Sequence, residues 1–129
     1  MGSGSLTHNL HEFRQSETVV TEDYVHEFVQ CARHAVMAHD TAALSDLGGA
    51  PHGHRAHPSD EHYLPLLIAS GASAAGESVE VIDGGVTYGV LSMEGYIFGN
   101  LPAVTPAVWV FERLKNKMTS ESIIVQHPQ

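Results

Sequence analysis

The sequence has 129 residues and a mass of 13.9 kDa, which is the size of one ordinary domain. Hydrophobic residues make up 43% and charged residues 16% of the chain, a balance that excludes wholesale disorder. Fifteen acidic residues against six lysines and arginines give a formal net charge of -9, so we expect no nucleic-acid partner and no anionic membrane surface as partner.

The single cysteine, Cys31, excludes an internal disulfide and a zinc site built from several cysteines. No apolar run reaches the roughly 18 residues that a membrane-spanning helix needs. The first five residues lack the basic and apolar regions of a secretory signal. We therefore expect a cytoplasmic protein.

The N-terminal half of the sequence predicts a loop and two helices. Residues 2–9 form a small, polar run that is typical of a strand end opening into a loop. Residues 21–40 show apolar side chains at helical spacing, and Thr21 can cap the start of this helix. Residues 40–47 indicate a short second helix that ends at two glycines.

The middle of the sequence predicts a histidine-rich loop followed by a buried helix. The loop covers residues 50–58, and Ser59 offers an N-cap for an apolar helix over residues 63–72. Pro65 cannot donate a helical hydrogen bond, so the first turn of this helix is expected to be irregular or shifted.

The last third of the sequence predicts strands. Alternating apolar residues over 79–92 indicate a hairpin that turns at Asp83-Gly84-Gly85, with a third short strand at Tyr96–Phe98. Residues 100–129 differ in character, with two prolines, an apolar stretch and a basic patch, and we interpret them as a divergent tail.

Histidine is the unusual residue type, because ten histidines outnumber all lysines and arginines together. Histidine is the commonest metal ligand and titrates near neutral pH. From spacing alone, His8 fits a partly exposed loop residue as well as a functional one. His26 and His34 fall off the apolar face of their helix and are expected on the surface.

The remaining candidates surround the start of the helix over 63–72. His52, His54 and His57 lie in one loop, and such a tract can bind divalent metal without being a dedicated site. His62 lies near a helix N-terminus, where the helix dipole disfavours the protonated ring and leaves a nitrogen lone pair available for a metal. A histidine without function at the helix start is the alternative.

Three motifs in order give a resemblance to a known family. Residues 56–72 contain His57-Pro58-Ser59-Asp60-Glu61-His62 followed by Pro65-Leu66, and resemble the H-P-x-x-E-H-x-x-P-L motif of class III extradiol ring-cleavage dioxygenases, in the branch of the DOPA extradiol dioxygenases. Residues 2–10 resemble the family's G-S-G-x-x-x-H-N-L strand and loop. Residues 88–99 resemble its closing Y-G-x-L-S-M strand.

The resemblance implies a set of roles. His62 matches a metal-ligand histidine, and His8 matches the histidine that acts as acid and base over the substrate. Asn9, His57 and Glu61 become candidate pocket residues. The implied cofactor is Fe(II) or Zn(II), and the implied substrates are a catecholic small molecule and O2. The implied fold is α/β, a partial three-layer sheet flanked by helices with a C-terminal β-hairpin.

The resemblance covers only part of the family's domain. Members of the family carry their first two ligand histidines in an N-terminal half that has no counterpart here, so residues 1–99 correspond to the C-terminal half. We therefore expect a fragment or subunit of a dioxygenase that is inactive alone and needs a chain supplying the missing half. The alternative is a non-catalytic binding or regulatory module that retains half of the fold, or a remnant whose open sheet edge promotes association.

Overall fold

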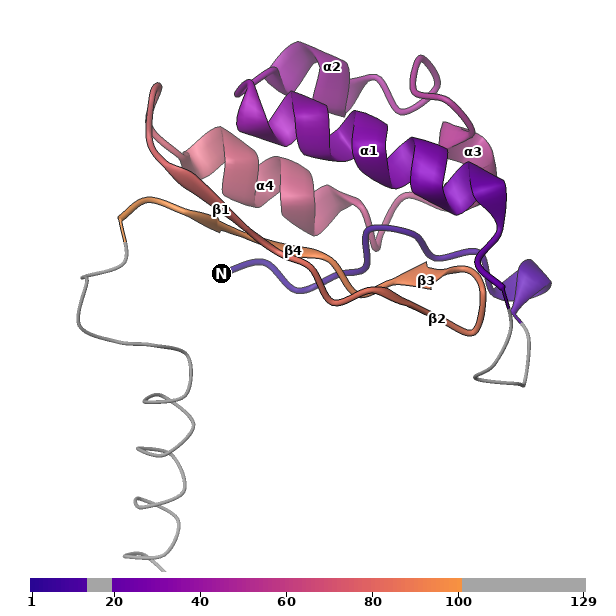
Figure 1. Ribbon diagram of the computed structural model, residues 1–129. Helices are drawn as coiled ribbons and strands as arrows, with labels where there is room; N and C mark the ends of the chain where they lie inside the picture. Colours follow the sequence, from indigo (N-terminus) through magenta and orange to yellow (C-terminus); the bar gives the residue numbers. More distant parts are fainter. Residues whose placement is uncertain (14–19, 101–129) are drawn as a thin grey trace, which may run out of the picture. The chain divides into compact units, whose positions relative to one another are not determined.

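The computed structural model describes residues 1–13 and 20–100 (Figure 1). The chain divides into two units, Met1–Gly99 and Asn100–Gln129. The helices and strands of the described residues all belong to the first unit. The interpretation of residues 100–129 as a divergent tail falls, except for Asn100, outside the described residues.

Helix α1, the longest helix within residues 1–13 and 20–100, covers Asp23–Met37 and confirms the helix predicted over residues 21–40. Its buried face consists of side chains at helical spacing: Tyr24, Val25, Phe28, Ala32 and Val36. The N-cap is Glu22 and not Thr21, and no side chain caps the helix. Instead the Glu22 amide donates to the carbonyl of Gly89 at 3.0 Å, so the start of α1 is tied to the strands.

Two short helices follow. Helix α2 covers Thr41–Ser45, and Asp40 caps it by accepting from the amide of Ala43 at 2.9 Å. Helix α3, Gly53–Ala56, is a single turn inside the segment that the sequence predicted as a loop. A Cβ at Gly53 would lie 1.8 Å from the carbonyl oxygen of Leu47, so this turn depends on a glycine.

Helix α4 covers Leu64–Ala72. Its N-cap is Tyr63, so Ser59 does not cap it as predicted. Pro65 lies in the first turn, where a missing amide hydrogen costs no helical bond. As expected, the first turn of the helix is shifted: α4 begins at Leu64, so Pro65 falls where its missing amide hydrogen does no harm.

The strands form one interrupted hairpin. β1 (Val79–Ile82) pairs antiparallel with β4 (Gly95–Phe98), and β2 (Val86–Thr87) pairs antiparallel with β3 (Leu91–Ser92). Between the two ladders, residues 83–85 face residues 93–94, so one arm carries an extra residue, as in a β-bulge.

The prediction of the hairpin turn at Asp83-Gly84-Gly85 is therefore wrong, because these residues lie between the two ladders. The tight turn lies at Tyr88-Gly89, where both residues have positive φ (51° and 76°), as a type I′ turn requires. Asp-Gly-Gly is the stronger turn signal of the two segments, because tyrosine rarely adopts positive φ.

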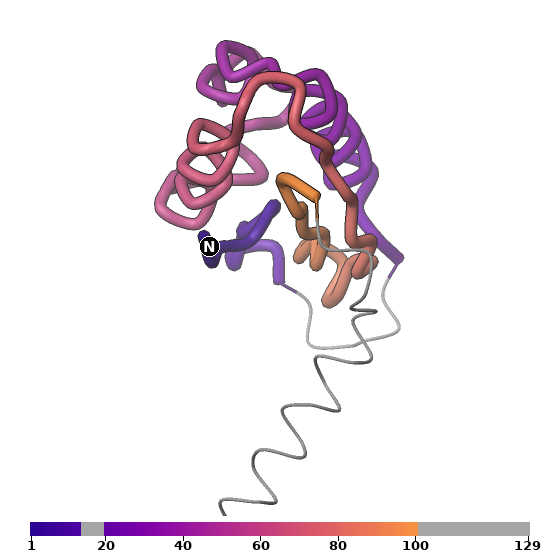
Figure 2. Tube along the Cα trace, turned by 90° about the vertical axis from the view of Figure 1, so that its left-hand side faces the viewer, coloured from indigo at the N-terminus to yellow at the C-terminus, as the bar shows by residue number. Residues whose placement is uncertain are grey.

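The helices lie on one side of the strands, as Figure 1 shows. Figure 2 shows the N-terminal segment running between α4 and the hairpin. The core lies where these parts meet and consists of eight buried side chains: Leu6, Tyr24, Val25, Phe28, Ala32, Ala56, Tyr63 and Val90. The predicted α/β fold with a C-terminal hairpin is thus confirmed.

Within residues 1–13 and 20–100, no helix has both the length and the apolar character needed to cross a lipid bilayer.

Candidate functional site

The two histidines singled out by the resemblance lie against each other. The rings of His8 and His62 stack with their centroids 3.6 Å apart and their planes inclined by 23°. Both residues are half-buried. His8 comes from the N-terminal segment and His62 from the turn before α4, so the contact joins two motifs that are distant in the sequence.

The loop that carries His8 is fixed by hydrogen bonds to α3. The His8 amide donates to the carbonyl of Ala56 at 2.8 Å. The neighbouring Asn9 is 6% exposed, and its amide group donates to the carbonyl of Arg55 at 2.7 Å. The Asn9 side-chain oxygen accepts from the amide of His11 at 3.1 Å and caps a short 3-10 helix, η1 (Leu10–Glu12). Asn9 thus fixes the loop to α3 and to η1.

Thr7 connects the same loop to the third motif. Its hydroxyl donates to the carbonyl of Val90 at 2.7 Å and accepts from the amide of Ser92 at 2.7 Å. All three residues are buried. Residues of all three motifs therefore meet in one part of the fold.

The glycines of the first motif allow the N-terminal segment to approach His62. The amide of Ser5 donates to the carbonyl of His62 at 3.0 Å. A Cβ at Gly4 would lie 2.3 Å from that carbonyl oxygen, and a Cβ at Gly2 would lie 2.7 Å from the carbonyl oxygen of Pro65. A Cβ essentially never lies within 3.0 Å of a non-bonded heavy atom, so the close approach to His62 and Pro65 requires glycine at both positions.

His57, predicted as a candidate pocket residue, lies in the core. It is 1% exposed and packs against Phe28 and Tyr63, with ring centroids 5.6 and 5.1 Å away. Its Nε2 faces the carbonyl of Leu6 at 2.6 Å. Burial lowers the pKa of His57, so the ring is neutral at pH 7.

Glu61, another candidate pocket residue, is exposed beside the histidine pair. A hydrogen bond from Ser59 lowers the pKa of its carboxyl group, and the nearby rings of His62 and His8 lower this pKa further. A carboxylate therefore lies close to both imidazoles.

A cavity of about 130 Å³ opens next to His62, between the N-terminal segment, α4 and β4. Leu66 and Ala69 of α4 contribute apolar surface, while Glu94 and Tyr96 contribute polar groups. Of the predicted site residues, only His62 lines it.

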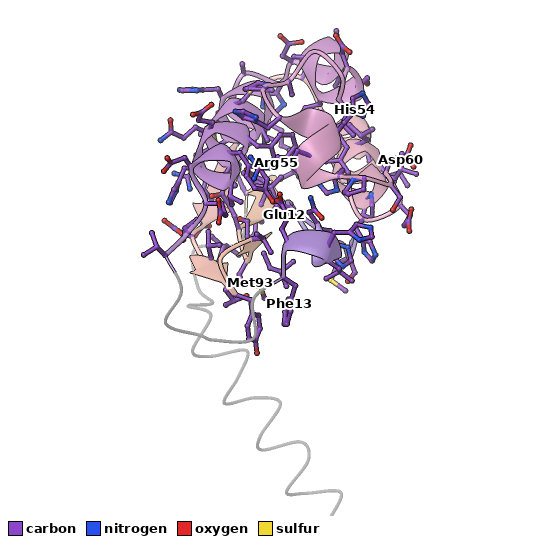
Figure 3. The ribbon with its side chains drawn as sticks, turned by 90° about the vertical axis from the view of Figure 1, so that its right-hand side faces the viewer. Glu12, Phe13, His54, Arg55, Asp60 and Met93 are labelled. Carbon is purple, nitrogen blue, oxygen red and sulfur yellow. The ribbon has the colours of Figure 1, made fainter. Side chains whose placement is uncertain are left out.

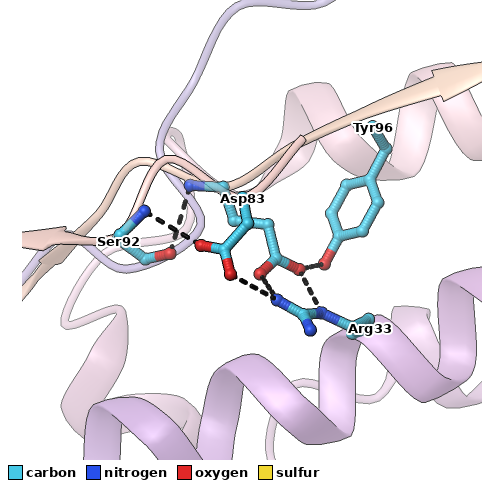
Figure 4. Close-up of polar contacts among 6 residues, drawn as sticks. Arg33, Asp83, Ser92 and Tyr96 are labelled. Carbon is cyan, nitrogen blue, oxygen red and sulfur yellow. Dashed lines mark hydrogen bonds and ion pairs between the residues drawn. The ribbon is translucent and has the colours of Figure 1, made fainter. Parts of the chain in front are cut away.

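The polar end of this cavity holds a network that the sequence did not reveal (Figure 4). Arg33 of α1 donates from Nε to Glu94 at 3.0 Å and lies 3.9 Å from the carboxylate of Asp83, and the Tyr96 hydroxyl donates to Glu94. Burial and the Glu94 carboxylate raise the pKa of Tyr96, so its hydroxyl stays protonated. Glu94 and Tyr96 lie within the third motif, but the helical pattern gave no sign that Arg33 would meet them.

A second polar contact steadies η1 and α3 (Figure 3). The Arg55 guanidinium lies 3.9 Å above the centre of the Tyr24 ring and forms an ion pair with Glu12 at 2.9 Å. Because Glu12 belongs to η1, this contact holds the residues that directly follow His8 and Asn9.

The other histidines of the loop lie apart from the pair. His52 contacts Glu27 of α1 at 2.8 Å, and His54 is exposed near Gly48. In the part of the chain that the structure describes, no group of three or more histidine, cysteine, aspartate or glutamate side chains is placed to hold a metal ion.

The stacked pair offers one metal ligand and not two. An imidazole binds a metal through a lone pair in its ring plane, and the planes of His8 and His62 are nearly parallel, so their lone pairs do not converge on one ion. The described residues therefore do not complete an Fe(II) or Zn(II) centre, although His62 suits a single ligand.

Comparison with known proteins gives a likeness of fold. No family model and no curated protein matches the sequence. Among solved structures, the chain is similar to the uncharacterized protein JW3007 from Escherichia coli K12, with a TM-score of 0.67 and 24% identity. The match covers 73% of this chain and 40% of the Escherichia coli chain, so it spans less than half the length of that protein.

Proposed function

We propose that this chain is a fragment or subunit of a metal-dependent extradiol dioxygenase. Such an enzyme inserts both atoms of O2 into a catecholic ring and opens the ring. The observation that carries the proposal is the contact between His8 and His62, because it brings together the two residues to which the resemblance gives chemical roles. The hydrogen bonds of Thr7 to Val90 and Ser92 support it further by joining the third motif to the first.

In this proposal His8 moves the proton. A catecholic substrate must lose a hydroxyl proton before its ring is attacked, and a neutral imidazole held over the ring accepts that proton and later returns one. The bonds from the His8 amide to Ala56 and from the Asn9 side chain to Arg55 hold the backbone that carries this imidazole. Positioning of this kind is a main source of rate enhancement in general acid–base catalysis.

His62 is the candidate metal ligand. When bound, an Fe(II) ion supplies open positions for the two oxygens of the substrate and for O2. Since the described residues offer one ligand, we propose that another chain, or further sequence, supplies the remaining histidines. The 40% share of the longer Escherichia coli protein supports a fold that continues in additional polypeptide. We also propose a cytoplasmic location, which agrees with the single cysteine.

Ring cleavage measured with and without the missing half tests this proposal. The chain is loaded anaerobically with Fe(II), mixed with DOPA or catechol, and exposed to O2. We expect negligible turnover by the chain alone and measurable turnover once a polypeptide carrying the family's N-terminal half is added. Robust turnover by the chain alone would contradict the proposal that another polypeptide must supply the remaining metal ligands. No turnover in the assembled complex would contradict the proposal that the chain is part of a dioxygenase.

Metal content of the assembled complex tests the role of His62. His62→Ala removes the candidate ligand and is expected to abolish metal binding. His26→Ala, which changes an exposed histidine of α1, is the matched control and is expected to leave binding unchanged. Equal metal content in the two variants would reject the ligand role.

The second candidate function is a non-catalytic binding or regulatory module. It is favoured by the lack of a three-ligand group within residues 1–13 and 20–100. A chain that folds stably, shows no dependence on metal and stays inactive with every complementing half would support the module over the enzyme.

A further inference from the structure

His57 is the one histidine among residues 1–13 and 20–100 that is buried, and the proposed mechanism gives it no task. Its ring lies between Phe28 and Tyr63 in the core. Its Nε2 approaches the carbonyl oxygen of Leu6 at 2.6 Å. Its Nδ1 is buried without a hydrogen-bond partner among the described residues.

These contacts define one protonation state. A carbonyl oxygen only accepts hydrogen bonds, so Nε2 of His57 must carry a hydrogen and donate it to Leu6. Burial disfavours the charged ring, and a charged ring would also leave a buried Nδ1–H without an acceptor. His57 is therefore a neutral donor with its hydrogen on Nε2.

The acceptor of this bond lies two residues before His8. The same short segment is held at three consecutive residues, through the Leu6 carbonyl, the Thr7 hydroxyl and the His8 amide. The Ala56 carbonyl that takes the His8 amide directly precedes His57. Residues 56–57 thus bind the backbone on both sides of Thr7.

We propose that His57 is a positioning residue whose Nε2–H, bound to the Leu6 carbonyl, fixes the backbone of the His8 loop and with it the face-to-face contact of His8 and His62. That this contact serves catalysis rests on the function proposed above. The positioning of the His8 loop by His57 does not depend on metal or substrate, so it can be tested in the folded chain without either.

Two substitutions separate the hydrogen bond from the packing of the ring. His57→Gln keeps an N–H donor at a similar distance from Cβ but loses the ring. His57→Phe keeps a ring against Phe28 and Tyr63 but loses the donor. A residue that only fills the core would tolerate phenylalanine better, whereas a positioning donor is rescued by glutamine.

The readout is the contact between the two imidazoles, measured in the full chain by proton NMR as a nuclear Overhauser effect and as ring-current shifts. We expect His57→Gln to retain the effect between the His8 and His62 ring protons and His57→Phe to lose it. Retention in His57→Phe, or loss in both variants, would overturn the proposal.

A measurement on the unaltered chain keeps the test decisive even where His57→Phe fails to fold. A long-range proton–nitrogen spectrum assigns the hydrogen of each imidazole to Nδ1 or Nε2. We expect His57 in the Nε2–H form at neutral pH, and an Nδ1–H or doubly protonated ring would overturn the proposal. These NMR measurements need neither metal nor substrate. If the ring contact is intact but the assembled complex is inactive, the result therefore contradicts the proposed dioxygenase function and not the positioning role of His57.

Discussion

Two groups of histidines in this molecule differ in how the fold treats them. His52 and His54 are neighbours in the sequence, yet His52 contacts Glu27 while His54 is exposed near Gly48. His8 and His62 are distant in the sequence, yet their rings stack, and buried His57 donates to the segment that carries His8. The comparison teaches that closeness in the sequence does not bring histidines together, whereas buried hydrogen bonds of the backbone bring distant histidines into contact.

The largest expected effect concerns Thr7. Thr7→Val keeps the side-chain volume but leaves the Val90 carbonyl and the Ser92 amide buried without a partner, at a cost of about 1–3 kcal/mol for each group. Thr41→Val, at an exposed position in α2, is the control and should change the free energy of unfolding by no more than about 0.5 kcal/mol. Denaturant unfolding of both variants measures the difference, and equal stabilities would show that the first and third motifs are not joined through this hydroxyl.

The next effect concerns the close approach at His62. Gly4→Ala places a Cβ against the His62 carbonyl and should destabilise the chain by about 1–3 kcal/mol through overpacking. Gly71→Ala adds a Cβ with no atom within 4 Å inside α4 and should be neutral or stabilise by up to about 1 kcal/mol. Thermal unfolding compares the two, and a harmless Gly4→Ala would mean that the N-terminal segment does not pack on His62.

The pH dependence of stability distinguishes His57 from the exposed histidines. Because burial lowers the pKa of His57 below 6.5, the unfolded chain takes up a proton that the folded chain does not as the pH falls through 6.5. Stability from this group is thus complete at higher pH and is lost below 6.5, by at most about 1.4 kcal/mol per pH unit. His57→Gln should remove this part of the slope. An unchanged slope in unfolding experiments between pH 5 and 7, roughly the range in which histidine titrates, would contradict a buried neutral ring.

The smallest effect is expected in the surface group. His52→Ala removes an exposed contact with Glu27 and should cost no more than about 1 kcal/mol. If His52→Ala lowered the free energy of unfolding as much as Thr7→Val does, the loop histidines would contribute to the stability of the fold as much as the three motifs do.

The sequence predicted the elements better than their connections. Helical spacing located α1, and the apolar run located α4 together with the displaced first turn at Pro65. The hairpin turn was misplaced because Tyr88 adopts a positive φ that local propensity disfavours. Capping by Glu22 was missed because the Gly89 carbonyl that its amide binds comes from the distant hairpin.

The candidate site was predictable only as far as the motifs reached. His8 and His62 were named, but their stacking depends on tertiary hydrogen bonds that no spacing reveals. The hydrogen bonds of His57 and Asn9 to backbone carbonyls were not predicted, since polar side chains with buried backbone partners look in a sequence like any loop residue. The contact of Arg33 with Glu94 joins a helix to the residues between β3 and β4, far along the chain, and left no local signal.

The most direct test of the central claim is ring cleavage by the Fe(II)-loaded complex of this chain with the family's N-terminal half, compared between His8→Ala and His54→Ala. The first variant changes the stacked pair and the second an exposed loop histidine. We predict that His8→Ala retains the metal but loses about 10²–10⁴-fold in turnover, as removal of a general base does, while His54→Ala keeps both. Equal turnover in the two variants would contradict the account.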